Sequence, residues 1–169
     1  MTLTKNKYYF EALDNYPYSL PECLEALNYT LSYDPEDADS LCLMGRIYSE
    51  QLRNYDLAKQ YFEEAMLCDV TNLNVPQYYI KCLLDNEDFQ EAEKLINYSL
   101  KIKGIEKSTL WFYRALLSEK RGSFANALTF LDESAKFCFS EYILNVVKDR
   151  KKFIKSKMQK KNKKKKETK

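Results

Sequence analysis

A period of 34 to 35 residues constrains this chain more than any other feature of its sequence. Ala58 has small counterparts at Cys23, Ala92 and Ala127, at steps of 35, 34 and 35 residues. Three further columns keep the same steps: the large Tyr55, Leu20, Phe89 and Phe124; the large Phe62, Leu27, Ile96 and Leu131; and the small Ala65, Thr30, Ser99 and Ser134. A fixed period of this length is typical of stacked supersecondary units.

Each repeat has the pattern of a helical hairpin. In residues 41–65, apolar and small residues recur at spacings of three and four on both sides of a short turn at Arg53-Asn54, which predicts two amphipathic helices. A small residue such as Ala58 lets the two helices approach closely, and Phe62, four residues later, lies on the same face. Because one hairpin cannot bury both of its faces, neighbouring hairpins are expected to stack into one core.

These columns resemble the tetratricopeptide repeat. The family pattern is matched in the second repeat by Leu41, Met44-Gly45, Tyr48, Ala58, Phe62 and Ala65, and elsewhere by Asp34-Pro35 and Trp111. The second repeat departs from the pattern by one extra residue between Tyr48 and Ala58. The resemblance implies an all-α, right-handed superhelical solenoid of about four hairpins, whose first helices line a concave groove for other proteins.

The predicted organisation is an array over residues 1–158, followed by a tail. The expected repeats are at about 4–35, 37–70, 74–104 and 107–139, with a capping helix at about 141–158. Helices are expected at about 4–15, 20–33, 37–52, 55–68, 75–85, 89–103, 107–121 and 124–139. In the capping helix, one apolar stripe is expected from Tyr142, Ile143, Val146, Val147, Phe153 and Ile154.

Charge is distributed unevenly along the chain. Residues 148–169 hold 13 Lys and Arg and 2 Asp and Glu, a net charge of +11, whereas the remaining residues hold 14 basic and 23 acidic ones, a net charge of −9. Self-repulsion and the lack of an apolar stripe predict that residues 159–169 form a disordered polybasic tail. The lysines expected to act electrostatically are Lys160, Lys161, Lys163, Lys164, Lys165 and Lys166. Nucleic acid, an anionic membrane surface, the acidic body and no dedicated partner all stay open for this tail.

Enzymatic chemistry is not expected. The chain has no histidine, which excludes histidine triads and histidine-ligated zinc, and its three glycines are too isolated to form a phosphate-binding loop. We expect no catalytic residue, cofactor or metal. The five widely spaced cysteines and the absence of an apolar N-terminal region predict reduced thiols and a cytoplasmic location.

A binding groove is the function that the resemblance implies. The positions projected onto it are Leu43, Arg46, Gln77, Tyr78, Lys81, Phe112, Tyr113 and Leu116, with Cys42 and one of Tyr8 or Tyr9 beside them. Aromatic residues and arginine commonly anchor interfaces. The clamp that holds a chaperone's terminal carboxylate in some members is not expected here, because no Asn accompanies Arg46 and Lys81. We predict an adaptor for a partner peptide or helix; the alternatives are a nucleic-acid- or ribosome-associated accessory protein and a homo-oligomer.

Overall fold

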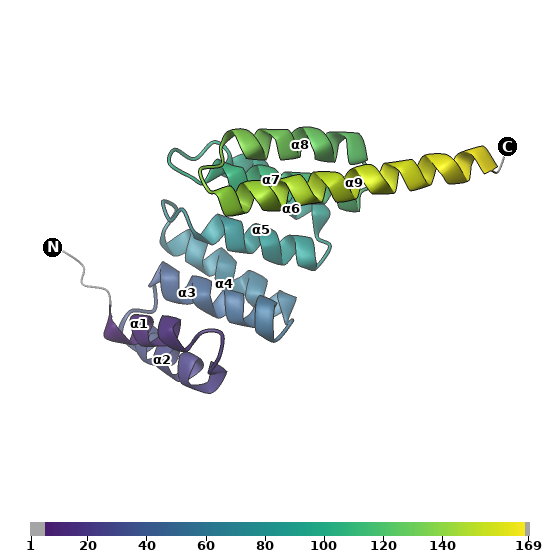
Figure 1. Cartoon of the computed structure of the whole chain (residues 1–169). Coiled ribbons are helices and arrows are strands. Elements are labelled where there is room, and N and C mark those ends of the chain that lie inside the picture. Colours follow the sequence, from purple (N-terminus) through teal and green to yellow (C-terminus); the bar gives the residue numbers. More distant parts are fainter. Residues whose placement is uncertain (1–5, 168–169) are drawn as a thin grey trace. The chain divides into compact units, whose positions relative to one another are not determined.

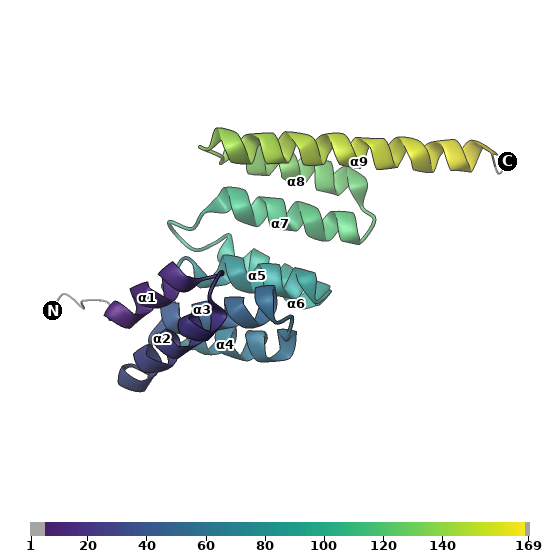
Figure 2. The ribbon, with the colours of Figure 1, turned by 60° about the horizontal axis from the view of Figure 1, so that its bottom comes forward.

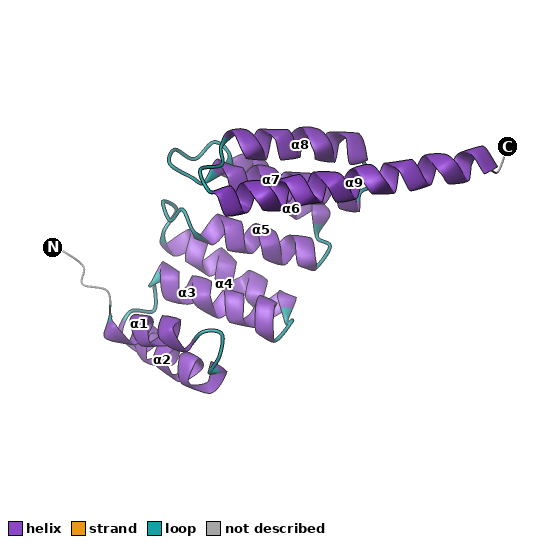
Figure 3. Cartoon of the chain, in the orientation of Figure 1, coloured by secondary structure: helices purple, strands orange, loops and turns teal. Residues whose placement is uncertain are grey.

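The computed structural model describes residues 6–167, with side chains placed as far as Lys160. Over that range the protein is all-helical and has no strand (Figure 3). The all-α fold class predicted from the repeat is therefore confirmed. No helix in the described range is long and apolar enough to cross a membrane. The chain divides into two compact units, Met1–Glu87 and Asp88–Lys169, and each is described by itself.

Helices pack against their neighbours along the chain within each unit (Figure 1). Unit 1 contains α1 (Lys7–Asn15), α2 (Leu20–Tyr33), α3 (Ala38–Arg46), η1 (Ile47–Gln51), α4 (Tyr55–Cys68) and α5 (Val75–Asp85). Unit 2 contains α6 (Phe89–Ser99), α7 (Lys107–Lys120), α8 (Phe124–Lys136) and α9 (Glu141–Glu167). Several helix starts are capped by a side chain; for example, Asp37 accepts a hydrogen bond from the Ser40 amide at 2.7 Å.

Three of the four repeat columns form the interior of both units, whereas the fourth, made up of Leu20, Tyr55, Phe89 and Phe124, is half-buried. Ala58 and Phe62 are fully buried in α4, and all of their counterparts in α2, α6 and α8 are at most 1 % exposed. The small column that includes Ala65 is also completely buried. Its polar members keep the helices close without a large side chain; in unit 2, Ser134 donates to the Ser108 carbonyl at 2.8 Å and so joins α8 to α7.

Gly45 shows how tightly the α3–α4 hairpin packs. A Cβ atom built at this position would lie 2.8 Å from Phe62 Cε1 and 2.9 Å from its Cδ1. Phe62 is itself fully buried and stacks on Tyr79 of α5, with ring centroids 5.4 Å apart. The absence of a side chain at residue 45 therefore sets the distance between α3 and the helix behind it.

The extra residue of the second repeat is absorbed by a π-helical turn. We predicted one continuous α-helix at 37–52, but the last turn is η1, in which the Leu52 amide donates to the Ile47 carbonyl five residues earlier at 3.1 Å. A π turn accommodates one additional residue without ending the helix. The turn that follows contains Arg53 at a φ of 52°.

Two second helices end earlier than predicted. Helix α6 ends at Ser99 rather than about 103, where the Ile102 amide bonds to the Ser99 carbonyl in a tight turn. Helix α8 ends at Lys136 rather than about 139, and the Phe137 amide bonds to the Ser134 carbonyl three residues back. Tighter turns of this kind satisfy backbone groups that an α-helix leaves unpaired at its end.

Helix α9 packs against α7 and α8 within unit 2, through a narrower apolar face than the sequence predicts. Val147 and Ile154 are buried at 1 % and 0 % exposure, whereas Tyr142, Val146 and Phe153 are 77 %, 37 % and 47 % exposed. The predicted single stripe was wrong because its members fall on two adjacent faces about 100° apart, and only one of them meets α7 and α8. Glu119 of α7 adds a polar contact to this buried face.

Helix α9 also continues beyond the predicted array boundary at residue 158. It runs to Glu167 and projects past the end of α8 (Figure 2). The structure therefore differs from the disorder predicted for residues 159–167; lysine and glutamine are good helix formers and extend a helix that is already nucleated. Residues 1–5 and 168–169, which include the first residues of the predicted first helix and the end of the tail, lie outside the described range.

Candidate functional site

Arg46, at the end of α3, is held between two aromatic rings. Its guanidinium carbon lies 4.2 Å from the ring centroid of Tyr78 on α5 and 4.7 Å from that of Tyr16 in the turn after α1. Both contacts have the geometry of a cation–π interaction. The two rings hold the guanidinium group in place. The Arg46 side chain is 20 % exposed, so part of it still reaches solvent.

Glu50 connects this arginine to further polar groups. The Tyr16 hydroxyl donates to the Glu50 carboxylate, while Arg46 Nε and Lys81 Nζ each lie 3.9 Å from Glu50 Oε1. Glu50 lies in η1, so the π turn directly determines where this carboxylate points. Lys81 also pairs with Asp85 at 3.1 Å. The result is a row of alternating charges along α3, η1 and α5.

A cavity of about 200 Å³ opens beside Arg46. It is lined by groups from α1, α3 and α5: Tyr9, Leu13, Asp39, Cys42, Leu43, Arg46, Asn74 and Tyr78. Since a water molecule occupies roughly 30 Å³ of liquid, the cavity has room for one side chain of a binding partner. Its wall is mixed: Leu13 and Leu43 are apolar, whereas Asp39 is a carboxylate that accepts a hydrogen bond from Asn72 at 2.7 Å.

The most specific feature of this cavity is an unsatisfied donor. Arg46 Nε is buried and has no hydrogen-bond partner among the described residues, because the 3.9 Å to Glu50 is too long. Buried polar groups are nearly always hydrogen-bonded, and an unpaired one calls for an explanation. Arg46 also lines the cavity, so this donor belongs to a side chain that borders the open space.

The titratable groups of the site are poorly suited to catalysis. Burial raises the pKa of the Cys42 thiol to about 12, so it stays protonated at neutral pH and is a weak nucleophile. Burial, and then the hydrogen bond to Glu50, raise the pKa of Tyr16 to about 12. Both groups are held in their neutral forms, which suits a binding surface.

Of the predicted groove residues of unit 1, Leu43, Arg46 and Tyr78 line the cavity and Lys81 joins them through Glu50, whereas Gln77 makes no such contact among the described residues. Arg46, Gln77, Tyr78 and Lys81 are half-buried, while Leu43 is only 2 % exposed and belongs to the α1–α2–α3 core as well as to the cavity wall. Of the two tyrosines considered on α1, Tyr9 lines the cavity and Tyr8 stacks on Tyr29 instead.

Sequence reasoning missed Tyr16, Glu50, Asp39 and Asn74. The spacing of Arg46 and Glu50 by four residues is a signal that could have identified Glu50. Tyr16 lies in a turn outside the repeat columns, and its approach to Arg46 depends on the tertiary fold. No column pattern indicates it.

The predicted groove residues of unit 2 all lie on α7. Phe112 packs against the buried cluster of α7, α8 and α9, which includes Ala115, Leu131 and Val147. The ring of Tyr113 lies 6.5 Å from that of Phe112, and Leu116 is half-buried. Phe112 therefore contributes to the core of unit 2 in addition to any exposed surface.

The tail lysines lie on the last turns of α9. Lys160 is exposed, and the backbone of residues 161–166 is helical. The side chains of Lys161, Lys163, Lys164, Lys165 and Lys166 are outside the described range.

Comparison with solved structures places this fold among helical-repeat proteins. PilF of Pseudomonas aeruginosa matches with a TM-score of 0.79 at 17 % identity, over 90 % of this chain and 68 % of that one. PilW, a type IV pilus biogenesis factor, matches with a TM-score of 0.68 at 18 % identity, over 77 % of this chain and 60 % of that one. MamA matches with a TM-score of 0.64 at 12 % identity, over 77 % of this chain and 70 % of that one.

These neighbours contain tetratricopeptide repeats, and the fold of this chain is tetratricopeptide-like. The chain spans about three fifths of the length of PilW. No protein-family model matches the sequence, and no curated protein does.

Proposed function

We propose that this protein is a non-enzymatic adaptor whose unit 1 binds an extended segment or helix of another protein. The segment would lie across the exposed edges of α1, α3 and α5 and place one side chain in the cavity beside Arg46. The buried, unpaired Nε of Arg46 supports this proposal most strongly, because it is a donor that the fold itself leaves without an acceptor.

The chemistry of the cavity suggests what would occupy it. Arg46 supplies the donor, Tyr9 and Tyr78 supply flat walls, and Leu43 supplies an apolar floor. A short side chain that ends in a carbonyl or carboxylate oxygen matches this combination. Glu50 already neutralises part of the charge of Arg46 and Lys81, so a strongly acidic segment is not required.

The free thiols are consistent with a reducing compartment such as the cytoplasm. None of the five cysteines, all within the described range, forms a disulfide, and three of them, Cys23, Cys42 and Cys82, are buried. Self-association remains the rival explanation for an adaptor fold of this size, and light scattering on the wild-type chain distinguishes a monomer from a homo-oligomer.

Affinity purification with site-directed variants tests the proposal. Tyr78→Ala removes one ring from Arg46, and Arg46→Lys keeps the charge but removes Nε and the planar guanidinium. Tyr98→Ala is the matched control, since Tyr98 is 49 % exposed on α6 in unit 2. We expect the same proteins to be lost with both unit 1 variants and retained with the control. Equal recovery by all three variants would contradict the proposal, provided that circular dichroism shows each one folded.

A further inference from the structure

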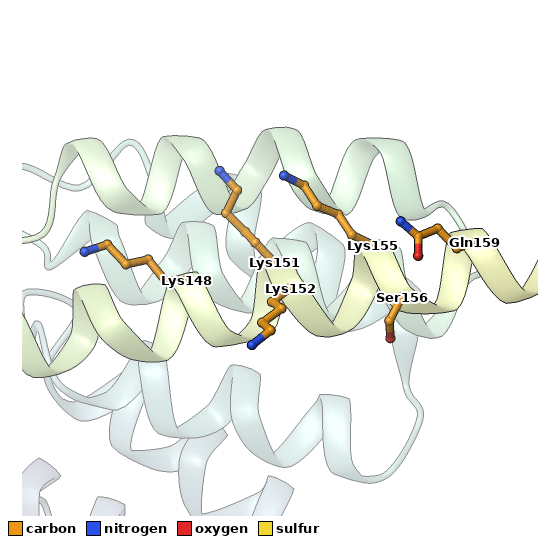
Figure 4. A pocket seen from close by; sticks show the side chains of 6 residues that line it. All are labelled: Lys148, Lys151, Lys152, Lys155, Ser156 and Gln159. Atoms are coloured by element: carbon orange, nitrogen blue, oxygen red, sulfur yellow. The ribbon is translucent and has the colours of Figure 1, made fainter.

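Helix α9 presents a row of basic side chains upstream of the tail. The row consists of Lys148, Lys151, Lys152 and Lys155, and it is continued by Ser156 and Gln159 (Figure 4). The spacings of three and four keep these residues on one side of the helix. Their side chains splay from successive turns around a shallow hollow of about 520 Å³. We call the four lysines the lysine row.

The lysine row differs from Arg150 and Lys157, two cations of α9 that are used within the fold. Arg150 and Lys157 both bond to the buried Glu119. In the lysine row, Lys151 contacts Asp132 of α8, whereas Lys148, Lys152 and Lys155 form no ion pair in the part of the chain described with side chains. The row therefore keeps at least three lysines available for an external anion.

We propose that the lysine row binds the phosphate backbone of duplex nucleic acid without reading its sequence. From Lys148 to Gln159 the helix extends about 17 Å, at about 1.5 Å per residue. A duplex presents one phosphate per strand about every 3.4 Å, so a straight row of this length passes about five phosphates of one strand. Gln159 adds a neutral donor of the kind that also contacts phosphates, whereas the Ser156 hydroxyl already donates to the Phe153 carbonyl at 2.7 Å.

The composition of the row favours a duplex over a single strand. Proteins that bind single strands stack bases on aromatic side chains, and the row contains none. Base-specific reading in the major groove commonly uses arginine, and the only arginine of α9, Arg150, is bonded to Glu119. The row is therefore suited to contact the phosphate backbone of a duplex through its lysines, which act as point charges.

The row is also a poor match for a membrane surface. Helices that lie on bilayers combine basic residues with an apolar face that enters the lipid. The hollow is lined only by lysine, serine and glutamine, and Ile154 and Val147 are buried against α7 and α8. Phe153 is 47 % exposed, but it lies about 100° around the helix from Lys152, away from the row, and Arg150 and Lys157 lie over its ring. A bilayer would therefore be bound through charge alone.

The acidic residues of the array do not prevent this contact. Residues 1–147 carry a net charge of −9, but at physiological salt exposed charges are screened beyond about 8 Å. Within unit 2, Asp132 already pairs with Lys151, and Asp149 lies about 100° around the helix from Lys148 and about 60° from Lys152 and forms no ion pair with either of these described side chains.

Salt-dependent binding of the full chain to a 20-base-pair duplex of arbitrary sequence tests the proposal. The row variant is Lys148→Gln with Lys152→Gln and Lys155→Gln; glutamine keeps helix propensity, and Lys151 is left in place for Asp132. The matched control, Lys94→Gln with Lys101→Gln and Lys103→Gln, removes the same charge from exposed positions around α6. A third variant replaces the tail lysines 161 and 163–166 by glutamine, so that row and tail are separated.

If the row contacts three phosphates, the salt dependence of duplex binding should change by a defined amount when the three lysines are replaced. The slope of log affinity against log salt should be shallower by about 2.7 in the row variant, and affinity at low salt should fall at least about tenfold, with no such change in the control. The tail variant should retain row-dependent binding, and the same duplex should bind more tightly than either of its single strands.

Three results would overturn the assignment. They are equal slopes for the row variant and the control, complete loss of duplex binding in the tail variant, and binding to phosphatidylserine vesicles without binding to the duplex. Because the row lies in unit 2, none of these results depends on the cavity of unit 1.

Discussion

The carboxylate of Glu119 lies 2.8 Å from Nε of Arg150, and this pair fixes α9 against α7. Glu119 is only 7 % exposed, and its other oxygen accepts from Lys157 Nζ, also at 2.8 Å. The two cations are seven residues apart, so they lie two turns apart on the same side of the helix. A buried acid with two basic partners therefore sets the position of α9 along unit 2.

Glu119→Gln should destabilise unit 2 by about 1–3 kcal/mol, the usual value of hydrogen bonds to charged groups. The loss stays in that range because Arg150 and Lys157 are 37 % and 41 % exposed and regain water when the carboxylate is removed. Urea unfolding measures the change. Glu91→Gln, at an exposed site on α6, is the control, and an equal effect in both variants would show that the pair is not important for stability.

Ile154→Ala should cost about 2–4 kcal/mol of unfolding free energy, because this side chain is fully buried in the α7–α8–α9 core. Its neighbour Phe153 is 47 % exposed, and Phe153→Ala should cost less than about 1 kcal/mol. Thermal or urea unfolding of the two variants compares the two faces of α9 directly. A larger loss for Phe153→Ala would mean that the helix packs through its other face.

Gly45→Ala should destabilise unit 1, since the new Cβ would lie within 3.0 Å of three ring carbons of Phe62. Overpacking of this kind costs about 1–3 kcal/mol, and the better helix propensity of alanine returns up to about 1 kcal/mol of it. In a protein that already carries Phe62→Leu, Gly45→Ala should lower the unfolding free energy by less than it does in the wild type. If the effects of the two substitutions on the unfolding free energy were strictly additive, the Phe62 ring would not limit the size of the side chain at residue 45.

Alkaline pH should weaken unit 1 partly through Tyr16. Its folded-state pKa is raised to about 12 by burial and by the bond to Glu50, so the folded chain holds this proton more tightly than the unfolded chain. The resulting stability is present below about pH 10 and is lost as pH rises toward 12. Between these values, the unfolding free energy of wild type should fall more steeply than that of Tyr16→Phe. Parallel curves would contradict the assignment, and Cys42, which is present in both proteins, does not affect the comparison.

The repeat columns predicted the architecture because they report close packing between helices. Small residues such as Ala58 and large ones such as Phe62 recur at one period, and the structure buries every member of those two columns. The irregular parts were less predictable. The extra residue before Ala58 indicated an insertion, but only the backbone shows that η1 absorbs it and points Glu50 at Arg46.

The candidate site was predicted in part for the same reason. Arg46 and Lys81 lie at equivalent places in first helices, as do Leu43 and Tyr78, so projection from the repeat predicts all four on one surface. Tyr16 and Asn74 lie near turns, where the period gives no position, and their contribution depends on how the chain folds back. The lysine row was hidden within a basic segment until α9 separated the lysines that face solvent from the cations that bond to Glu119.

Site-specific photo-cross-linking tests the partner-binding surface most directly. A photoreactive residue replaces Asn74, which is exposed and borders the cavity, or Asn97, which is exposed on α6 and serves as the control. The account predicts a cross-linked partner protein at residue 74 that disappears when Arg46→Lys is added and is absent at residue 97. Cross-links of equal yield at both positions, or an Asn74 product that is unaffected by Arg46→Lys, would contradict it.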